Sequence, residues 1–334
     1  MKKKNREILI WGNAVILALM FSFTACEDTP GDILDPDTAG VWTLMTTGSG
    51  LPSNQIIDIE RDADNNLWVA FSGMGVGKVR DGKWTFYRTA NSSLLSDNVT
   101  SLAATSDGGM IIGTINGIAK VTSTGIWSSY KDPTVTTMSI NTIAVTSDGT
   151  TWVGTETEGY YVDDGSGYDQ VLLAPFVNVN AITEDNNGIV YLGTDNALLE
   201  YSGTYTRIIT TAAGLPANNI SSLFFDSKER LWVGTEGGKT VSWTDDAMTF
   251  NQLSLMNGSS GTSITEIFED RRGHIWFATS SDGLIEYDGV IPHSYKMYSG
   301  FFEDNVTCIG EDESGNIWIG LATKGLVRYT LPID

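Results

Sequence analysis

The sequence contains little histidine, little cysteine and few basic residues. With two His and two Cys among 334 residues, the chain offers little for a zinc cluster or a disulfide framework. It has 20 Lys and Arg against 41 Asp and Glu, which gives a formal net charge of −21. Because a nucleic-acid partner requires a basic face, this balance excludes nucleic acid from the partners that we expect.

Long apolar runs are equally scarce. The chain contains a single one, at residues 8–25, and four basic residues precede it. A basic head before an apolar run too short for a comfortable bilayer span is typical of a secretory signal. The run ends in Phe-Thr-Ala-Cys, which resembles a bacterial lipobox and implies that Cys26 is diacylated and becomes the mature N-terminus. A plain signal peptide cleaved nearby, with Cys26 an ordinary thiol, is the alternative.

These features divide the chain into three parts. We expect a lipoprotein signal peptide at residues 1–26, an acidic flexible tether rich in Pro and Gly at residues 27–40, and a folded domain at residues 41–334. The lipid would hold the domain at the outer membrane or the cell surface, and would be its only contact with a membrane.

The folded part repeats one unit. Segments such as NLWVAF, TTWVGT and NIWIGL recur, each around a large residue that we call the anchor. A β-branched residue stands twelve before every anchor, an aliphatic residue nine before it, and Ala or Gly two after it. Seven aligned copies predict a repeat architecture. The anchors are spaced by 43, 41, 39, 41, 44 and 42 residues, and they are Trp68, Ile111, Trp152, Tyr191, Trp232, Trp276 and Trp318.

Each copy reads as four short β-strands joined by turns. Four strands in about 40 residues are typical of a propeller blade, so we expect an all-β fold, a seven-bladed β-propeller of four-stranded blades. The last copy stops after three strands, whereas residues 41–47 (VWTLMTT) form a predicted strand without a blade. Pairing of this N-terminal strand with residues 325–330 is expected to complete the last blade and close the ring.

Repeats such as EDESGNIWIGLATKGLVRY resemble two-component regulator propeller repeats, which occur in periplasmic sensors of Bacteroidetes. The resemblance covers about residues 41–331 and implies extracytoplasmic sensing of a ligand, often a glycan fragment. Those sensors continue into a transmembrane helix, a kinase and a regulator, whereas this chain ends at Asp334. We therefore expect sensor-like binding without a signalling output of its own.

The first candidate site is a ring of polar residues at the start of the innermost strands. A ring of uncharged amides and hydroxyls around a channel mouth could hydrogen-bond the hydroxyls of a sugar. Caps that satisfy backbone amides at the strand entry are the alternative. The seven residues stand thirteen before the anchors, and they are Gln55, Asn98, Ser139, Asn178, Asn219, Ser263 and Asn305.

The second candidate site is a set of acidic residues in the loops after the anchor strands, which we expect on the same face. Such a patch could attract a cation, a basic peptide or a cationic partner protein. A solvated acidic surface is the alternative interpretation. The residues are Glu156, Glu158, Asp195, Glu236 and Asp282.

The sequence shows no convincing catalytic constellation, and we expect no catalytic residues, no metal and no cofactor. His274 stands two before its anchor, at a position that varies between copies, and His293 falls near a fourth strand, so both are interpreted as structural. Asp62 and Asp64 mimic the start of a calcium loop, but Leu67 stands where that loop requires Gly. A hairpin turn is the expected structure there.

Three functions follow from this sequence. The expected one is an envelope lipoprotein whose monomeric, non-catalytic propeller binds an oligosaccharide or an envelope protein. The second is an enzyme, either a lyase like those that inactivate streptogramin antibiotics or a glycan-active enzyme with two carboxylates over a cleft. The third is a structural scaffold within an envelope complex.

Overall fold

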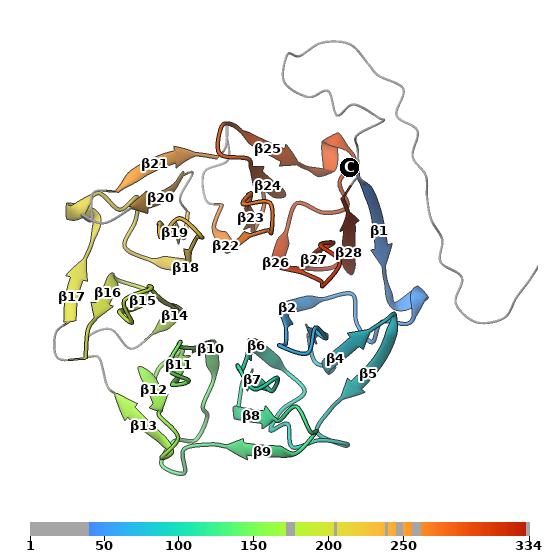
Figure 1. The fold of residues 1–334 in the computed structure, drawn as a ribbon, viewed down its shortest axis with the longest axis vertical. Helices are drawn as coiled ribbons and strands as arrows, with labels where there is room; N and C mark the ends of the chain where they lie inside the picture. Colours follow the sequence, from blue (N-terminus) through green and yellow to red (C-terminus); the bar gives the residue numbers. More distant parts are fainter. Residues whose placement is uncertain are drawn as a thin grey trace, which may run out of the picture.

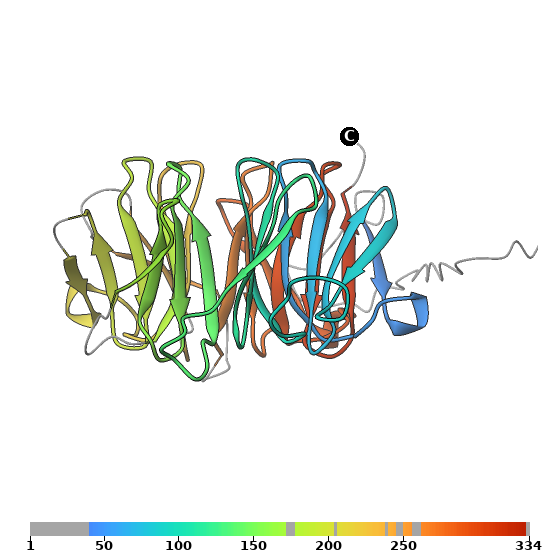
Figure 2. The ribbon, with the colours of Figure 1, turned by 90° about the horizontal axis from the view of Figure 1, so that it is seen from below.

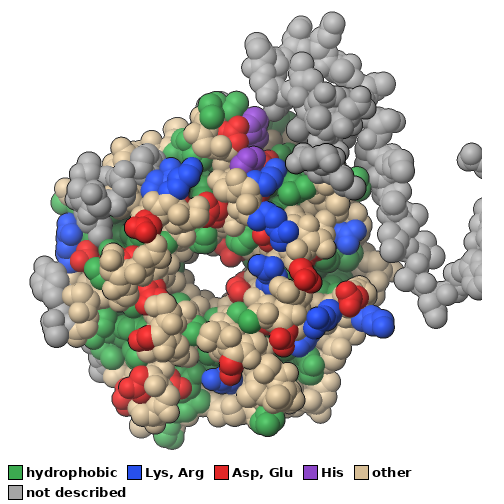
Figure 3. All heavy atoms as spheres, in the orientation of Figure 1, with side chains coloured by type: hydrophobic (Ala, Val, Ile, Leu, Met, Phe, Trp, Pro, Cys, Tyr) green, Lys and Arg blue, Asp and Glu red, His purple; other side chains and the backbone are tan. Residues whose placement is uncertain are grey.

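The strands are arranged in a ring (Figure 1), and the space-filling view shows a central channel through it (Figure 3). Seen from the side, the ring is a flat disc with loops on two opposite faces (Figure 2). The predicted all-β propeller class is confirmed, because helix in the described residues is limited to three 3-10 turns, η1 (Thr47–Ser49), η2 (Thr211–Ala213) and η3 (Met297–Ser299). The structure is a computed structural model, and it describes residues 40–171, 178–203, 206–237, 240–244, 250–255 and 262–331.

The described strands form seven antiparallel sheets of four strands, which we number as blades 1 to 7 from the chain's first complete sheet. The innermost strands are β2 (Ile56–Arg61), β6 (Val99–Ala104), β10 (Ile140–Val145), β14 (Val179–Glu184), β18 (Ile220–Phe225), β22 (Ile264–Glu269) and β26 (Val306–Glu311). The second strands carry the anchors, and they are β3 (Leu67–Phe71), β7 (Met110–Thr114), β11 (Thr151–Thr155), β15 (Val190–Thr194), β19 (Leu231–Thr235), β23 (Ile275–Thr279) and β27 (Ile317–Leu321).

The outer half of each blade is formed by two further strands. The third strands are β4 (Gly75–Arg80), β8 (Gly117–Val121), β12 (Tyr160–Asp163), β16 (Leu198–Tyr201), β20 (Thr240–Thr244), β24 (Leu284–Tyr287) and β28 (Leu326–Thr330). The outermost strands are β5 (Lys83–Tyr87), β9 (Trp127–Tyr130), β13 (Tyr168–Val171), β17 (Thr206–Ile209), β21 (Asn251–Ser254), β25 (Pro292–Tyr295) and β1 (Val41–Met45).

The N-terminal strand closes the ring, as the sequence predicts. β1 pairs antiparallel with β28, from Val41 opposite Thr330 to Met45 opposite Leu326. The Trp42 side chain on β1 stacks on Tyr329 with ring centroids 4.1 Å apart, and it also packs against Tyr295 of blade 6. The closing strand therefore completes the sheet of blade 7 and also contacts blade 6.

Neighbouring blades approach each other closely where the sequence has Gly two residues after the anchor. A Cβ built on Gly193 would lie 2.6 Å from Ile220 Cγ2 of the next blade. The same clash arises at Gly234, whose Cβ would lie 2.8 Å from the Cβ of Ile264. These contacts explain why small residues recur there and β-branched residues recur twelve before the anchor.

Four anchors are held by a hydrogen bond, buried in three blades and partly buried in blade 7, that the sequence pattern alone did not reveal. The indole N–H of each donates to an Asp six residues earlier in the chain, at 2.8–2.9 Å. That Asp also accepts backbone N–H groups of its own turn, so one carboxylate fixes both the hairpin and the anchor. The four pairs are Asp62–Trp68, Asp226–Trp232, Asp270–Trp276 and Asp312–Trp318.

The structure gives no description of the predicted membrane anchor. Cys26, the signal segment and residues 27–39 of the tether lie outside the described residues. In the described part, no helix has the length and the apolar character that a bilayer crossing requires.

Candidate functional site

The innermost strands share one irregularity that re-aims one side chain in each blade, a polar one in every blade except blade 1. In every blade the pairing register shifts by one residue between twelve and ten residues before the anchor. Such a β-bulge inserts an extra residue and re-aims its side chain. The inserted residues form a second ring of partly exposed side chains, which we call the bulge ring: Ile57, Thr100, Asn141, Asn180, Ser221, Thr265 and Thr307.

Sequence reasoning missed the bulge ring, although its signal was available. Its members stand two residues after the predicted ring, and residues two apart in a strand face the same side. Three of them hold the next blade: Asn180 Nδ2 donates to Ile220 O at 3.1 Å, Ser221 Oγ to Ile264 O at 2.6 Å, and Thr265 Oγ1 to Val306 O at 2.7 Å. Part of this ring is therefore structural.

The predicted ring and the loops after the anchor strands do lie on one face, which we call the entry face. The backbone carbonyls of Gln55 and Asn98 accept the N–H groups of Ser72 and Ile115, at 3.0 and 3.2 Å. Equivalent bonds recur at four more members of the ring, whose carbonyls accept N–H groups at 3.0–3.1 Å: Ser139, Asn219, Ser263 and Asn305. These bonds tie each strand start to its loop.

A depression of about 560 Å³ opens at the entry face across blades 1 to 4. Its polar lining comes mainly from the two rings, with Asn98 and Ser139 from the predicted ring and Thr100, Asn141 and Asn180 from the bulge ring. Ser72, in the loop after β3, completes it. The Oγ1 of Thr100 is buried and has no hydrogen-bond partner among the described residues. This site therefore presents amides and hydroxyls, one of them free, for a ligand without charge.

The apolar part of this lining includes Ile57 and Ile115, and the Ile115 side chain is 43% exposed. Members of the predicted ring outside the depression take other roles. Asn178 Oδ1 accepts a hydrogen bond from Asn141 Nδ2 at 2.7 Å, and Asn219 donates to Glu236 at 2.6 Å. The five that do not line it are Gln55, Asn178, Asn219, Ser263 and Asn305.

The acidic loops do not form the uniform patch that the sequence suggested. Glu156 and Glu236 are exposed, and Glu158 and Asp195 are partly buried. Asp282 is the exception, because it is only 5% exposed and its carboxylate accepts from Lys296 Nζ at 2.7 Å and from Thr262 Oγ1 at 3.1 Å. Placing Asp282 in an open acidic patch is therefore wrong, since the side chain serves to hold blade 6 together.

The sequence analysis overlooked carboxylates on the innermost strands of blades 1 and 6, Asp58, Glu60 and Glu266, which we call the carboxylate wall. Asp58 Oδ2 accepts the N–H of Leu102 in blade 2 at 2.6 Å, and Glu266 Oε2 accepts the N–H of Ile309 in blade 7 at 2.6 Å. Both stand ten before their anchors, where blade 7 has the buried thiol of Cys308. Each carboxylate thus links two blades.

These carboxylates titrate far from their usual range. Burial raises the pKa of Asp58 to about 6, although N–H groups of Leu102 and Ile59 lower it. Burial, followed by the charge of Asp58, raises the pKa of Glu60 to about 8. Burial and then Asp58 also raise the pKa of Glu266 well above its ordinary value. This part of the wall carries less negative charge near neutral pH than its composition suggests.

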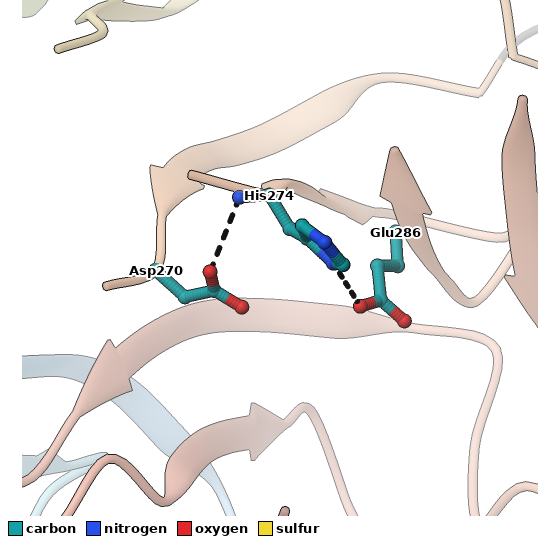
Figure 4. Close-up of side chains that lie close together, drawn as sticks. All are labelled: Asp270, His274 and Glu286. Atoms are coloured by element: carbon teal, nitrogen blue, oxygen red, sulfur yellow. Dashed lines mark hydrogen bonds and ion pairs between the residues drawn. The ribbon is translucent and has the colours of Figure 1, made fainter. Parts of the chain in front are cut away.

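One further cluster contains a histidine. His274 Nδ1 lies 2.7 Å from Glu286 Oε1, and the backbone N–H of His274 donates to Asp270 at 3.1 Å (Figure 4). Ligand atoms of Asp270, His274 and Glu286 lie within 4.8 Å of one another, which is the spacing of a metal site. However, the Arg272 guanidinium pairs with both carboxylates, and Tyr295 Oη donates to Glu286 at 2.7 Å.

The donors around Asp270 and Glu286 therefore occupy the cluster already. A metal ion would have to displace the Arg272 guanidinium, so these residues fit a structural network better than a metal centre. His293 lies 3.7 Å from Asp288 and is 40% exposed in its side chain. The His side chains lie toward the outer rim, away from the open channel (Figure 3).

The calcium-like segment is a turn, as expected. Asp62 Oδ1 accepts the backbone N–H groups of Asp64 and Asn66 at 3.1 and 2.8 Å. Its other oxygen is bound by the Trp68 indole at 2.8 Å. The carboxylate is thus consumed within the hairpin.

Comparison with known proteins agrees with this geometry. The family described as two component regulator propeller matches residues 50–73, 214–237, 258–281 and 300–322. The matched segments fall in four blades. They are blades 1, 5, 6 and 7, and they are the four blades with an Asp–Trp hydrogen bond at the anchor. We call them the regular blades, and we call blades 2, 3 and 4 the divergent blades.

Solved structures share the fold. The extracellular domain of the hybrid two-component system BT3049 from B. thetaiotaomicron has a TM-score of 0.72 at 19% identity over 87% of this chain, which spans 42% of that domain. Virginiamycin B lyase from Staphylococcus aureus gives 0.70 at 15% identity, with 84% and 96% of the two chains covered.

PorZ, a surface component of the type-IX secretion system of Porphyromonas gingivalis, gives a TM-score of 0.67 at 15% identity, with 84% of this chain and 47% of PorZ covered. A comparison with curated protein sequences finds no match. At these identities the likeness shows a common propeller and leaves the ligand to be inferred from the site.

Proposed function

We propose that this protein is a cell-envelope lipoprotein whose propeller binds an uncharged oligosaccharide at the entry face, without turnover. The observation that carries this proposal is the depression of about 560 Å³ across blades 1 to 4. Its polar lining of Asn98, Thr100, Ser139, Asn141 and Asn180 offers donors and acceptors without formal charge. Sugar hydroxyls pair with such groups without the desolvation cost of an ion.

The shape and the apolar lining fit this ligand class. Ligand sites combine an apolar surface with a few placed polar groups, and Ile57 and Ile115 supply the apolar part here. The buried hydroxyl of Thr100 without a partner would gain a hydrogen bond from a ligand. Export and a lipid on Cys26 would place this face outside the inner membrane, where such glycans are met.

Binding without catalysis is the form of this proposal that the chemistry supports. The histidine cluster in blade 6 is occupied by Arg272. Asp58 and Glu60, whose pKa values are raised, share β2 with Ile57 but do not line the depression. No pair of carboxylates lines the depression at the entry face. A hydrolase needs two carboxyl groups flanking the scissile bond.

The experiment is a thermal-shift screen of neutral and acidic oligosaccharides, followed by calorimetry on two matched variants. Asn141→Leu removes an amide from the depression, whereas Thr265→Val alters the bulge ring on the other side of the channel. We expect a hit that stabilises the wild type and Thr265→Val and that loses at least tenfold in affinity with Asn141→Leu. Equal loss in both variants, or conversion of the hit to products, would contradict the proposal.

A further inference from the structure

The opposite face, where the innermost strands end, carries a recurring clamp between blades. In blade 3, the Ser147 N–H donates to Glu184 Oε2 of blade 4 at 2.6 Å, and Ser147 Oγ donates to Oε1 at 3.1 Å. In blade 5, Ser227 donates in the same way to Glu269 of blade 6, at 2.6 and 2.7 Å. One serine in a hairpin turn thus holds both oxygens of a carboxylate from the next blade.

The clamp follows the repeat numbering. The serine stands five before the anchor of its own blade, and the glutamate stands seven before the anchor of the next. Blade 2 has Ser106 at the serine position, but blade 3 has Val145 where the glutamate would stand. Ser106 is exposed, and neither its N–H nor its Oγ has a hydrogen-bond partner among the described residues. Blade 2 therefore has the serine of the clamp, whereas blade 3 lacks the glutamate that would bind to it. We call the serine with its free N–H and Oγ the carboxylate receptor.

The space of the absent side chain is open. A depression of about 440 Å³ lies there, with Ser106, Ala63, Ala104 and Val145 in its lining. Ala104 and Val145 are both shorter than the glutamates of blades 4 and 6, which leaves room for a carboxylate from outside the chain.

The same depression has a cation in its lining. Arg61 is exposed, has no ion pair among the described residues, and its one hydrogen bond is to Asn65 Oδ1 at 3.4 Å. The acidic member of the lining, Asp62, is only 2% exposed and already pairs with Lys78 at 3.6 Å. The charge of Arg61 acts on the buried Glu60 of the same strand, and no carboxylate in the lining pairs with it.

We propose that this depression binds a glutamate side chain of another polypeptide, with the carboxylate on the N–H and Oγ of Ser106 and with Arg61 as its counter-charge. A glutamate is favoured over a uronate sugar because the two filled copies of this receptor hold a glutamate side chain. The lining also has no aromatic ring on which a sugar could stack. The site lies on the face opposite the oligosaccharide site and does not depend on it.

The test is a titration followed by backbone amide NMR of the protein, with N-acetyl-glutamic acid α-amide as the probe. We expect a saturable downfield shift of the Ser106 amide proton, and no such shift with the matched N-acetyl-glutamine α-amide. Arg61→Gln, a substitution of an exposed side chain, should lower the affinity for the probe about tenfold, since a charge-assisted bond is lost. Ser106→Ala should weaken it as well.

Val145→Glu should install the missing clamp, and Val145→Gln is its matched control. With Val145→Glu the Ser106 amide should be shifted before any probe is added and should no longer respond. An unmoved Ser106 amide in the wild type, or equal shifts by both probes, would overturn the proposal. Tighter saturation by trigalacturonate than by the glutamate probe would overturn the choice of a polypeptide ligand and assign the receptor to acidic sugars.

Discussion

The regular and the divergent blades have the same backbone and different chemistry. Blades 5, 6, 7 and 1 match the family repeat, and in each an Asp carboxylate accepts a hydrogen bond from the anchor Trp. Blades 2 and 3 have Thr105 and Thr146 at that position, and in blade 4 the anchor is Tyr191. Both depressions lie mainly over the divergent blades. We therefore infer that the regular blades mainly stabilise the ring, and we place both proposed ligand sites over the divergent blades together with the adjoining edge of blade 1.

The largest effect should come from opening the ring at the regular side. Deletion of residues 41–47 removes β1 and exposes the edge of β28 together with the apolar rings around Trp42. We expect the melting temperature to fall by more than about 10 °C, because a whole strand and a buried aromatic are lost. Calorimetry measures this, and an unchanged melt would show that the closure does not stabilise the ring.

A smaller effect should separate the two kinds of blade at the anchor. Asp226→Ala in regular blade 5 leaves the Trp232 indole and the Arg230 guanidinium without their carboxylate, at a cost of about 3 kcal/mol in unfolding free energy. Thr146→Ala in divergent blade 3 loses hydroxyl bonds within one turn and should cost about 1 kcal/mol. Chemical denaturation of both variants gives the comparison, and equal costs would remove the distinction.

The carboxylate wall predicts that the stability of the fold depends on pH. Since folding raises the pKa values of Asp58 and Glu60 to about 6 and 8, the folded state binds these protons more tightly than the unfolded state does. Stability is then fully present below the ordinary carboxylate pKa and decreases as the pH rises toward 8. We expect the double variant Asp58→Asn, Glu60→Gln to melt a few degrees higher than the wild type at pH 8.

The same double variant should melt like the wild type at about pH 3, below the ordinary carboxylate pKa values of 3.8 and 4.5, where both carboxylates are protonated in the folded and the unfolded state. Two results would contradict this account. One is a melting temperature of the wild type that rises steadily from pH 5 to pH 8, and the other is a double variant that melts below the wild type at pH 8. Other carboxylates act at lower pH: hydrogen bonds from Thr105 and Thr134 lower the pKa values of Asp107 and Asp132, so their contribution is lost only in more acidic solution.

The smallest effect on stability should come from the bulge ring. Thr265→Val breaks the bond to Val306 O and should cost about 1 kcal/mol, whereas Asn141→Leu, whose amide bonds other side chains, should cost less. Urea denaturation distinguishes them. A larger loss for Asn141→Leu would mean that the divergent side of the ring is also built for stability.

The repeat made most of the fold predictable. Periodic apolar residues gave the strands, the Gly after the anchors gave the close contact of blades, and the orphan strand at residues 41–47 gave the closure. The candidate sites were harder to predict from the sequence. The predicted ring contributed Asn98 and Ser139 to the depression, but the bulge that turns Asn141 and Asn180 into it depends on strand pairing.

Two further features needed three-dimensional structure for a physical reason. Asp282 looks like any loop carboxylate in the sequence, and only packing brings Lys296 to 2.7 Å from it. Asp58 and Glu266 are distant in the sequence, yet ring closure brings their charges close enough to act on each other and on Cys308 of blade 7. Polar contacts across blades depend on which side chains meet, and the repeat pattern alone does not fix that.

The most direct test of the division between the two sides is a crystal structure of the protein with an oligosaccharide hit from the screen. We predict sugar density in the entry-face depression, with hydrogen bonds to Asn141 and to the free hydroxyl of Thr100. Density over the regular blades instead, against Glu266 or the loop of Asp282, would contradict the claim that the divergent blades carry the ligand site.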